Sequence, residues 1–377
     1  MTTEEFTGEW LMNLRKLALL FLIFFICSAW GGVVSVAQSR LSTGTLLMYT
    51  IDSTDEATEL TVYTIDPVTG EHTFLLRYGY PSRSSLSFDF FDQKTQKMYL
   101  VEVPLKPGEV IWGKIGRLLS VDVNTGDVTV VYERLHLWYA HPYPEENHLI
   151  VGYFHPEQRR PLPIPPLQCI LDLLAHTCDE LTEGVFPPIS SENVYWLDSE
   201  RFLWVDNGGI LVSDLSTETT VPYFIPPDQC IDDSVHPQPV PDTNQFIVGL
   251  DEECSLAETR RFALFETQTS KLTPLVVPDN VLSDFVISPD GEFMLYRDEV
   301  TQSYIIGVFN SSSVLWDTGL NPDIFGSVSW LPDSSGIIGT LWTRNYSPVS
   351  IVAFDIASGE TCVLSDTNLV AHFISIE

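Results

Sequence analysis

Six acidic residues recur at similar places in a repeated pattern, and their carboxylates are the first candidates for chemistry. They are Asp92, Glu145, Asp198, Asp242, Asp290 and Asp333, and successive members are 53, 53, 44, 48 and 43 residues apart. Several stand in turns such as Ser288-Pro289-Asp290-Gly291, where proline presets φ and the aspartate side chain caps backbone N–H groups. We therefore expect turn formers here, and no catalytic ring of carboxylates.

Other residue types that could act chemically lack the spacing of a known catalytic or metal motif. The sequence has no Gly-x-Ser-x-Gly nucleophile elbow, and its serine, histidine and aspartate residues are scattered. It also has no Cys-x-x-Cys or His-x-x-x-His pair, which argues against zinc. We predict no catalytic residue, no metal site and no cofactor.

Hairpins position the repeated acids. In Asp284–Tyr296 (DFVISPDGEFMLY), two strand-like segments flank the Ser-Pro-Asp-Gly turn. A second hairpin follows in each unit, as in Leu119–Val131 (LSVDVNTGDVTVV). Two hairpins give four antiparallel strands per unit, and a repeat of this length with four strands is typical of a propeller blade.

Counting the units gives seven blades, which begin near Leu46, Ser85, Trp138, Asn193, Val235, Leu282 and Ser327. The first unit lacks its innermost hairpin, whereas a spare strand at Leu369–Ile376 follows the last. We therefore predict an all-β fold, a seven-bladed β-propeller of four-stranded antiparallel blades. The ring closes when the C-terminal strand pairs into the first blade, which leaves no innermost sheet edge unpaired.

The two hairpins of each unit resemble those of a known family. Ser-Pro-Asp-Gly inner hairpins followed by outer hairpins such as Val352–Glu360 (VAFDIASGE) are similar to the propeller repeats of TolB and of prolyl-oligopeptidase and dipeptidyl-peptidase relatives. The resemblance covers roughly residues 46–377. It implies a propeller of six to eight blades without a hydrolase domain, and it implies no activity, because such propellers serve several functions.

A second set of candidate residues lies in the connections between blades, around the expected channel. These ligand-rim candidates are Tyr80, His136, Trp138, Asp232, Asp233, Asp279, Asp284, Asp323 and Asp366. Aromatic and acidic side chains around a funnel suit a cationic, carbohydrate-like or peptide ligand. The alternative is that these are ordinary solvated loops, with aromatic side chains filling the channel.

The N-terminus and the charge indicate where the protein works. Arg15 and Lys16 precede a compact apolar run, and Ser35 and Ala37 fit a cleavage site, so residues 1–37 are predicted to be a signal peptide or, alternatively, an uncleaved membrane anchor. Residues 38–45 would be a linker and residues 46–377 the propeller. With 19 basic against 51 acidic residues, the net charge of −32 repels nucleic acid and anionic lipid.

Cysteine placement fits an oxidising compartment. Cys169 and Cys178 bracket a predicted hairpin, and Cys230 and Cys254 form the other candidate pair, which leaves Cys362 over. We expect two local disulfide bonds, and a protein that is secreted or tethered to the membrane by its N-terminal segment.

The functional prediction is a non-enzymatic extracytoplasmic binding or scaffold propeller, with a protein, peptide or small ligand at the rim formed by the inter-blade loops. An envelope or extracellular protein is the expected partner, with no nucleic acid, and with the membrane involved only through an uncleaved N-terminal segment. Two alternatives stay open. One is a propeller enzyme, a lyase or glycan-active protein, that acts at the channel mouth; the other is a structural module of the cell envelope.

Overall fold

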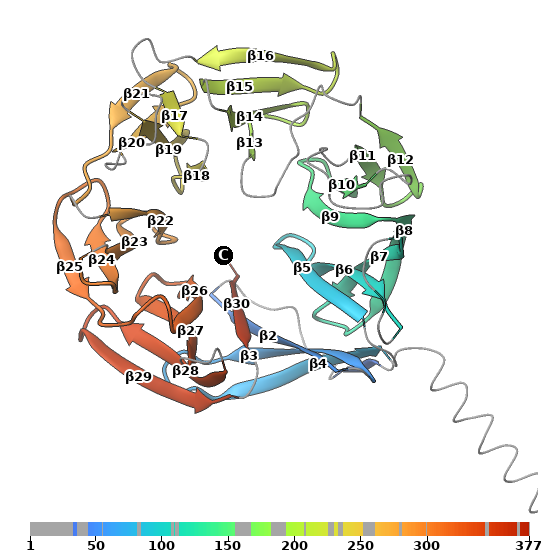
Figure 1. The fold of residues 1–377 in the computed structure, drawn as a ribbon, viewed down its shortest axis with the longest axis horizontal. Helices are drawn as coiled ribbons and strands as arrows, with labels where there is room; N and C mark the ends of the chain where they lie inside the picture. Colours follow the sequence, from blue (N-terminus) through green and yellow to red (C-terminus); the bar gives the residue numbers. More distant parts are fainter. Residues whose placement is uncertain are drawn as a thin grey trace, which may run out of the picture.

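The computed structural model describes residues 33–35, 44–54, 56–80, 84–106, 109, 113–154, 167–181, 194–206, 209–224, 230–232, 237–251, 261–278, 281–298, 300–343, 347–367 and 370–376. Within these ranges the regular secondary structure consists of antiparallel strands, which form seven sheets. The sheets stand around a central axis as the seven blades of a β-propeller (Figure 1), which confirms the predicted fold class.

Each of the first three blades runs outward from an innermost strand near the axis. Blade 1 contains, in this order, β30 (Ala371–Ser375), β2 (Leu46–Ser53), β3 (Thr58–Ile65) and β4 (His72–Tyr80), with β1 (Val33–Ser35) added beside β4. Blade 2 contains β5 (Ser84–Asp92), β6 (Lys97–Pro104), β7 (Ile115–Asp122) and β8 (Val128–Leu135). Blade 3 contains β9 (Leu137–Pro142), β10 (His148–Tyr153), β11 (Leu167–Asp172) and β12 (Thr177–Glu180).

Four further blades complete the ring. Blade 4 contains β13 (Val194–Trp196), β14 (Arg201–Asp206), β15 (Gly209–Asp214) and β16 (Thr219–Phe224). In blade 5, β17 (Cys230–Asp232) and β18 (Gln238–Pro239) both pair with β19 (Gln245–Asp251), followed by β20 (Arg261–Glu266) and β21 (Lys271–Pro274). Blade 6 contains β22 (Val281–Ile287), β23 (Phe293–Asp298), β24 (Tyr304–Val308) and β25 (Val314–Asp317). Blade 7 contains β26 (Phe325–Trp330), β27 (Gly336–Trp342), β28 (Pro348–Asp355) and β29 (Glu360–Asp366).

The C-terminal strand closes the ring as predicted. Strand β30 pairs antiparallel with β2, with Ala371 opposite Thr50 and Ser375 opposite Leu46. It therefore supplies the innermost strand that the first unit of the sequence lacks. Because the two ends of the propeller meet in one sheet, every blade has a neighbour on both sides.

Hydrophobic side chains fill the space between neighbouring blades. The described residues form seven buried clusters, one for each pair of adjacent blades. Between blades 2 and 3, for example, Val101 and Leu118 pack with Ala140 and Val151. A single four-stranded sheet cannot bury both of its faces, so these clusters explain why the blades are stable only as a ring.

The two faces of the ring differ in their connections. Turns within hairpins, such as residues 93–96 between β5 and β6 or 143–147 between β9 and β10, lie on one face, which we call the hairpin face. The described connections from one blade to the next, such as residue 136 between β8 and β9 and residues 318–324 between β25 and β26, lie at the opposite ends of the strands, which we call the connection face. The repeated acids belong to the hairpin face, and the predicted ligand-rim residues belong mostly to the connection face.

The predicted turn chemistry is confirmed at the opening hairpin. Asp290 Oδ1 accepts hydrogen bonds from the Ser288 hydroxyl at 2.6 Å and from the Glu292 amide at 3.0 Å. Gly291 takes a φ of 73°, a value that side chains with a Cβ rarely adopt. Asp92 likewise accepts from the amides of Lys94 and Thr95 at 3.0 and 3.3 Å.

Candidate functional site

A pocket of 460 Å³ opens on the hairpin face between blades 2 and 3. Its walls are the β5–β6 turn of blade 2 and the β9–β10 turn of blade 3, with Leu173 and Leu174 from the β11–β12 turn at one side. Strands β5 and β9 are the innermost strands of their blades (Figure 1), and the pocket extends from them to Ser120 of β7 and Val131 of β8, farther from the propeller axis. Its volume is that of a small-molecule site.

Aromatic rings form the inner part of the pocket. Phe90 and Tyr99 stack with their ring centroids 4.7 Å apart and their planes 13° apart. Tyr99 is 4% exposed, and burial raises the pKa of its hydroxyl. The buried Tyr99 ring therefore supports Phe90, which is partly exposed and is the aromatic ring that a flat ligand could contact.

Charged side chains form the rim. The pocket is lined by Asp92, Lys94 and Lys97 from blade 2 and by Glu145, Glu146 and His148 from blade 3. The Lys94 ammonium forms an ion pair with the Glu146 carboxylate across the gap between the two turns. With His148 neutral, these six side chains carry a net charge of −1, so the rim offers both hydrogen-bond donors and acceptors with little net field.

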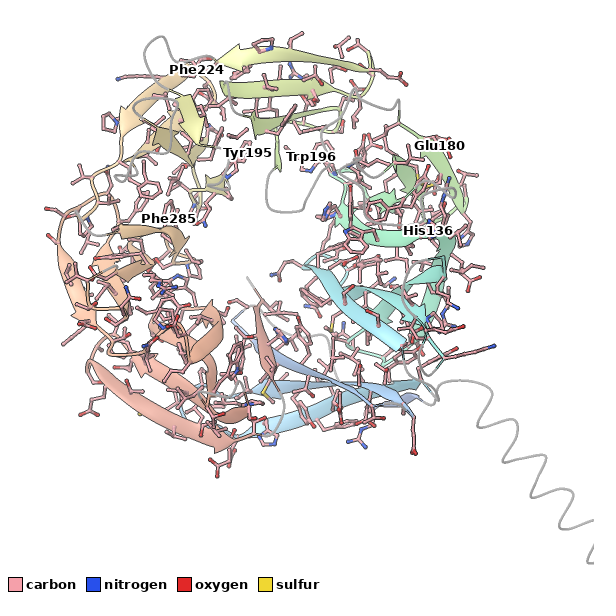
Figure 2. All side chains as sticks on the ribbon, viewed as in Figure 1. His136, Glu180, Tyr195, Trp196, Phe224 and Phe285 are labelled. Atoms are coloured by element: carbon pink, nitrogen blue, oxygen red, sulfur yellow. A yellow bond between two sulfur atoms is a disulfide. The ribbon has the colours of Figure 1, made fainter. Side chains whose placement is uncertain are left out.

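His148 is the side chain at this pocket that is best placed to move a proton. Its Nδ1 donates to the Glu146 carbonyl oxygen at 3.0 Å, which leaves Nε2 as the acceptor nitrogen of the neutral ring. The ring packs against Tyr143, with centroids 5.9 Å apart, and Tyr143 in turn contacts Trp196 of blade 4. Figure 2 labels Trp196, at the inner side of its blade. The imidazole is therefore held in orientation by a backbone bond and by aromatic packing.

A carboxylate stands near the same imidazole. Asp172 Oδ2 lies 3.9 Å from His148 Nε2. The amides of Ala175 and Leu174 donate to Asp172 at 2.9 and 2.7 Å, and these bonds lower the pKa of the Asp172 carboxyl below its usual value. Asp172 is thus ionised at neutral pH, and it places a negative charge near the Nε2 atom of His148.

The sequence did not reveal this pocket. Asp92 and Glu145 were recognised as turn acids, which they are, and functional residues were expected on the opposite face of the ring. The pocket exists because two turns about fifty residues apart in the chain become neighbours when blades 2 and 3 pack. The one signal in the sequence was the conjunction of Lys94, Lys97 and His148 near two successive inner turns of a chain that is poor in basic residues.

The predicted ligand-rim residues are dispersed over several blades. Tyr80 ends β4 and lies under the Arg117 guanidinium, 4.7 Å from its ring centroid. Trp138 is 47% exposed and makes an edge-to-face contact with Phe154 at 5.2 Å. His136 is buried and takes a φ of 59° in the one-residue connection between β8 and β9 (Figure 2).

The acidic members of that set are also spread out. Asp323 pairs with Arg297 at 3.4 Å, and Asp366 accepts from Ser350 at 3.4 Å. The backbones of Asp232 and Asp284 belong to β17 and β22, whereas Asp233 and Asp279 lie outside the described residues. A shared ligand rim stays a prediction, as does a protein partner.

Sequence reasoning also missed a buried ion pair on the connection face. Glu102 is fully buried, and its carboxylate accepts from the Arg117 guanidinium, the Tyr78 hydroxyl at 3.2 Å and the Ser84 hydroxyl at 3.4 Å. Burial raises the pKa of Glu102, and the neighbouring Arg117 charge lowers it. The cluster joins blades 1 and 2, and the three donors around the buried Glu102 carboxylate give it a structural role.

One predicted disulfide is confirmed. Cys169 on β11 and Cys178 on β12 are bonded, with their Cα atoms 5.5 Å apart, and they tie together the outer hairpin of blade 3. The second candidate pair cannot be placed, because Cys254 and the Cys230 side chain lie outside the described residues. Cys362 is exposed on β29 with a free thiol.

The described part of the chain shows no metal-binding cluster and no membrane span. Among these residues, no group of three or more His, Cys, Asp and Glu side chains is arranged to hold a metal ion. None of the described segments is a helix long and apolar enough to cross a bilayer. The predicted signal or anchor segment falls almost wholly outside the described ranges, except that β1 pairs with β4 in blade 1.

Comparison with known proteins gives structural matches only. No protein-family model and no curated protein matches the sequence. Among solved structures, an oligogalacturonate lyase in complex with manganese has a TM-score of 0.53 at 12% identity, over 83% of this chain and 94% of that one. A periplasmic gluconolactonase of Pseudomonas aeruginosa has a TM-score of 0.52 at 14% identity, and the match covers 88% of this chain and 99% of that one. An uncharacterized protein of Listeria monocytogenes has a TM-score of 0.53 at 10% identity, and the match covers 88% of this chain and 94% of that one.

These matches bear on the predictions in two ways. At such low identity they show that the chain shares a propeller fold with these proteins; membership of the TolB-like family is not shown by them. The prediction of a non-enzymatic binding or scaffold module is corrected, because the matching structures with a named function, a lyase, a lactonase and a dihydro-heme d1 dehydrogenase, are enzymes. They favour the alternative, a propeller enzyme.

Proposed function

We propose that the protein is an enzyme that hydrolyses a small, uncharged carbohydrate derivative, with a sugar lactone as the leading candidate. The reaction would take place in the 460 Å³ pocket between blades 2 and 3. The observation that carries the proposal is the combination, in one cavity, of an aromatic surface and an oriented histidine. The partly exposed Phe90, backed by the buried Tyr99 ring, would bind the sugar ring, and His148 would transfer the proton.

Hydrolysis of a lactone fits the residues at the rim. A water oxygen forms a bond to the carbonyl carbon while His148 Nε2 takes one of the water protons. The C–O bond of the lactone ring then breaks, and the same proton passes from Nε2 to the leaving alkoxide. Lys97 would stabilise the negative charge on the carbonyl oxygen in the intermediate, and Asp172 would stabilise the imidazolium. The product is an open-chain hydroxy acid.

Charge favours a neutral substrate over an acidic one. Residues 161–377 contain 32 acidic and six basic residues, whereas residues 77–160, which include the two turns of the pocket, contain ten of each. The pocket thus lies in a charge-balanced sector of a strongly acidic ring. An anionic polymer would be repelled by the rest of the surface, while a neutral lactone would not, and its anionic product would be expelled.

The comparisons and the sequence supply supporting context. Two of the similar structures are named for substrates derived from sugar acids, an oligogalacturonate and a gluconolactone. A location outside the cytoplasm is supported by the Cys169–Cys178 disulfide and by the predicted signal segment, and one of the similar structures is a periplasmic protein. We also propose membership of the TolB-like propeller family on the basis of the repeated hairpins.

A substrate panel tests the proposal. The full-length protein is assayed in a pH-stat against δ- and γ-lactones of aldonic acids, and spontaneous hydrolysis is subtracted. Oligogalacturonate is the acidic comparison, and its cleavage is followed by new reducing ends and by the ultraviolet absorbance of unsaturated products, because it releases no proton. The proposal expects turnover of at least one neutral lactone above the spontaneous rate and little activity on the anionic polymer. Absence of turnover on every lactone, or turnover of oligogalacturonate alone, would reject it.

A further inference from the structure

A serine and a histidine meet where the last blade joins the first. Ser327 lies on β26, the innermost strand of blade 7, and His372 lies on β30, the innermost strand of blade 1 (Figure 1). Ser327 Oγ and His372 Nδ1 are 3.3 Å apart and hydrogen bonded. Both side chains are partly exposed, and neither residue lines the pocket between blades 2 and 3.

The backbone at Ser327 is strained. Its φ is 53°, in the left-handed region that residues with a Cβ rarely adopt. Among the described non-glycine residues with a positive φ, Ser327 is the one inside a strand, while the others occupy turns and connections. In the register with β27 the pairing skips from Gly326 to Ser329, so a bulge interrupts the ladder at Ser327. A bulge re-aims a side chain, and such strain persists where the surroundings hold it in place, as they do at many functional sites.

A threonine of the neighbouring strand holds the two residues together. Thr340 of β27 is fully buried and pairs with Gly326, the residue before Ser327. Its hydroxyl donates to the carbonyl oxygen of Ala371 at 2.8 Å and accepts from the amide of Ala371 at 3.2 Å. Ala371 is the residue before His372, so one buried side chain fixes the backbone beside both members of the pair. The hydrogen bond between Ser327 and His372 is therefore built into the junction of blades 7 and 1.

The imidazole of His372 is oriented and neutral. It stacks on the Tyr49 ring of β2, with the centroids 4.9 Å apart and the planes 14° apart. Burial lowers the pKa of His372 below its ordinary value of 6.5. A neutral imidazole has one nitrogen that accepts a proton, and with the ring proton on Nε2 this is Nδ1, the atom next to Ser327 Oγ. A hydroxyl that is hydrogen bonded to the accepting nitrogen of an oriented histidine is an activated nucleophile.

We propose that Ser327 is a nucleophile, with His372 as its general base, and that it takes the acyl group of a small carboxylic ester. Oγ forms a bond to the carbonyl carbon while its proton passes to Nδ1 of His372. The ester C–O bond then breaks, and the leaving alkoxide takes that proton and departs as the alcohol. Water hydrolyses the acyl-serine in a second step, in which Nδ1 takes a proton from the water and returns it to Ser327 Oγ. This chemistry does not require turnover in the pocket between blades 2 and 3.

A fluorophosphonate probe tests the nucleophile directly. Ser327 Oγ would form a bond to the phosphorus atom and fluoride would leave, while His372 takes the hydroxyl proton. The full-length protein is incubated with an alkyl fluorophosphonate, and the labelled residue is located by peptide mass spectrometry. We expect one adduct, on Ser327, and none in protein unfolded in urea, because the pair forms only when blades 7 and 1 meet.

Three variants separate an activated serine from one that is merely accessible. S327G removes the hydroxyl and suits the φ of 53°, so it should fold and stay unlabelled. H372Q removes the general base and should slow the labelling of Ser327 by at least about 100-fold. S329A is the matched control: Ser329 is a partly exposed serine of the same strand whose hydroxyl donates to the Trp330 carbonyl oxygen, and its loss should leave the labelling rate unchanged.

Two results would overturn the proposal: wild-type protein without an adduct on Ser327, or labelling of H372Q at the wild-type rate. If circular dichroism shows that H372Q does not fold, the peptide map of the wild type decides. Label confined to Ser327 supports the pair, whereas label spread equally over exposed serines such as Ser312 contradicts it.

Discussion

Replacing Asp89 by asparagine should stabilise the protein at neutral pH and have no such effect in acid. Folding raises the pKa of Asp89 from 3.8 to about 7, so the folded state holds this proton more tightly than the unfolded state does. Protonated Asp89 therefore contributes to the unfolding free energy below pH 3.8, and this contribution is lost as pH rises through 7. A difference of about three in pKa corresponds to ~4 kcal/mol at pH 8.

The asparagine keeps the contact that matters in the folded state. Its side-chain oxygen can accept from the Ala140 amide, as the carboxylate does at 2.8 Å. Its NH2 group has to be buried as well, which costs about 1–2 kcal/mol if it finds no partner. That cost is independent of pH. It shifts the difference in unfolding free energy between the two proteins by a constant, so the test is how this difference changes with pH.

Urea unfolding of wild type and D89N at pH 4, 5, 6, 7 and 8 measures this change. The unfolding free energy of D89N minus that of wild type should rise by about 3–4 kcal/mol from pH 4 to pH 7 and then level off. The many other acidic groups cancel in the difference, since they are common to both proteins. A difference that is flat across the range would show that Asp89 is ionised at its ordinary pKa and would refute the reasoning.

Three further predictions concern the ring and its blades. Deleting Leu369–Glu377 removes β30 and should unfold the propeller, and a truncated protein with wild-type circular dichroism and melting temperature would refute closure by this strand. G152A places a Cβ 2.2 Å from the Tyr139 ring and should cost about 1–3 kcal/mol in urea unfolding, whereas G79A, with open space at the Cβ position, should cost less than about 1 kcal/mol. Removing the disulfide with C178S should lower the unfolding free energy by about 2–3 kcal/mol, and equal stability of the variant and wild type would contradict this.

The fold could be predicted because it is encoded locally. Each inner hairpin carries its own turn chemistry, as Ser288 and Asp290 show, and each hairpin has the same place in its blade. The irregular first and last units predicted closure because an unpaired strand and a missing strand complement each other. Four-stranded sheets with two apolar faces then leave few alternatives to a ring.

The site could not be predicted, because it depends on which turns meet. Asp92 and His148 belong to different blades, and their proximity follows from the packing of blades 2 and 3. Asp89 illustrates the same limit at one residue: its sequence neighbours are phenylalanines, and only the bulge between Phe88 and Phe90 brings its carboxyl to the Ala140 amide of blade 3. The expectation of function on the connection face rested on aromatic and acidic residues in the connections between blades, and it stays a prediction.

The role of His148 in turnover tests the central claim most directly. For the neutral lactone that the wild type hydrolyses fastest, H148Q should lower kcat/KM by at least ~100-fold, because it removes the proton acceptor while keeping an amide donor for the Glu146 carbonyl. H176Q is the matched control: His176 is exposed in the β11–β12 turn, and its φ of 54° equals that of Gln96 and Gln302, so glutamine fits there. We expect H176Q to keep the wild-type kcat/KM and H148Q to lose about 100-fold in kcat/KM. Equal kcat/KM in H148Q and wild type would contradict the assignment of this pocket as the active site.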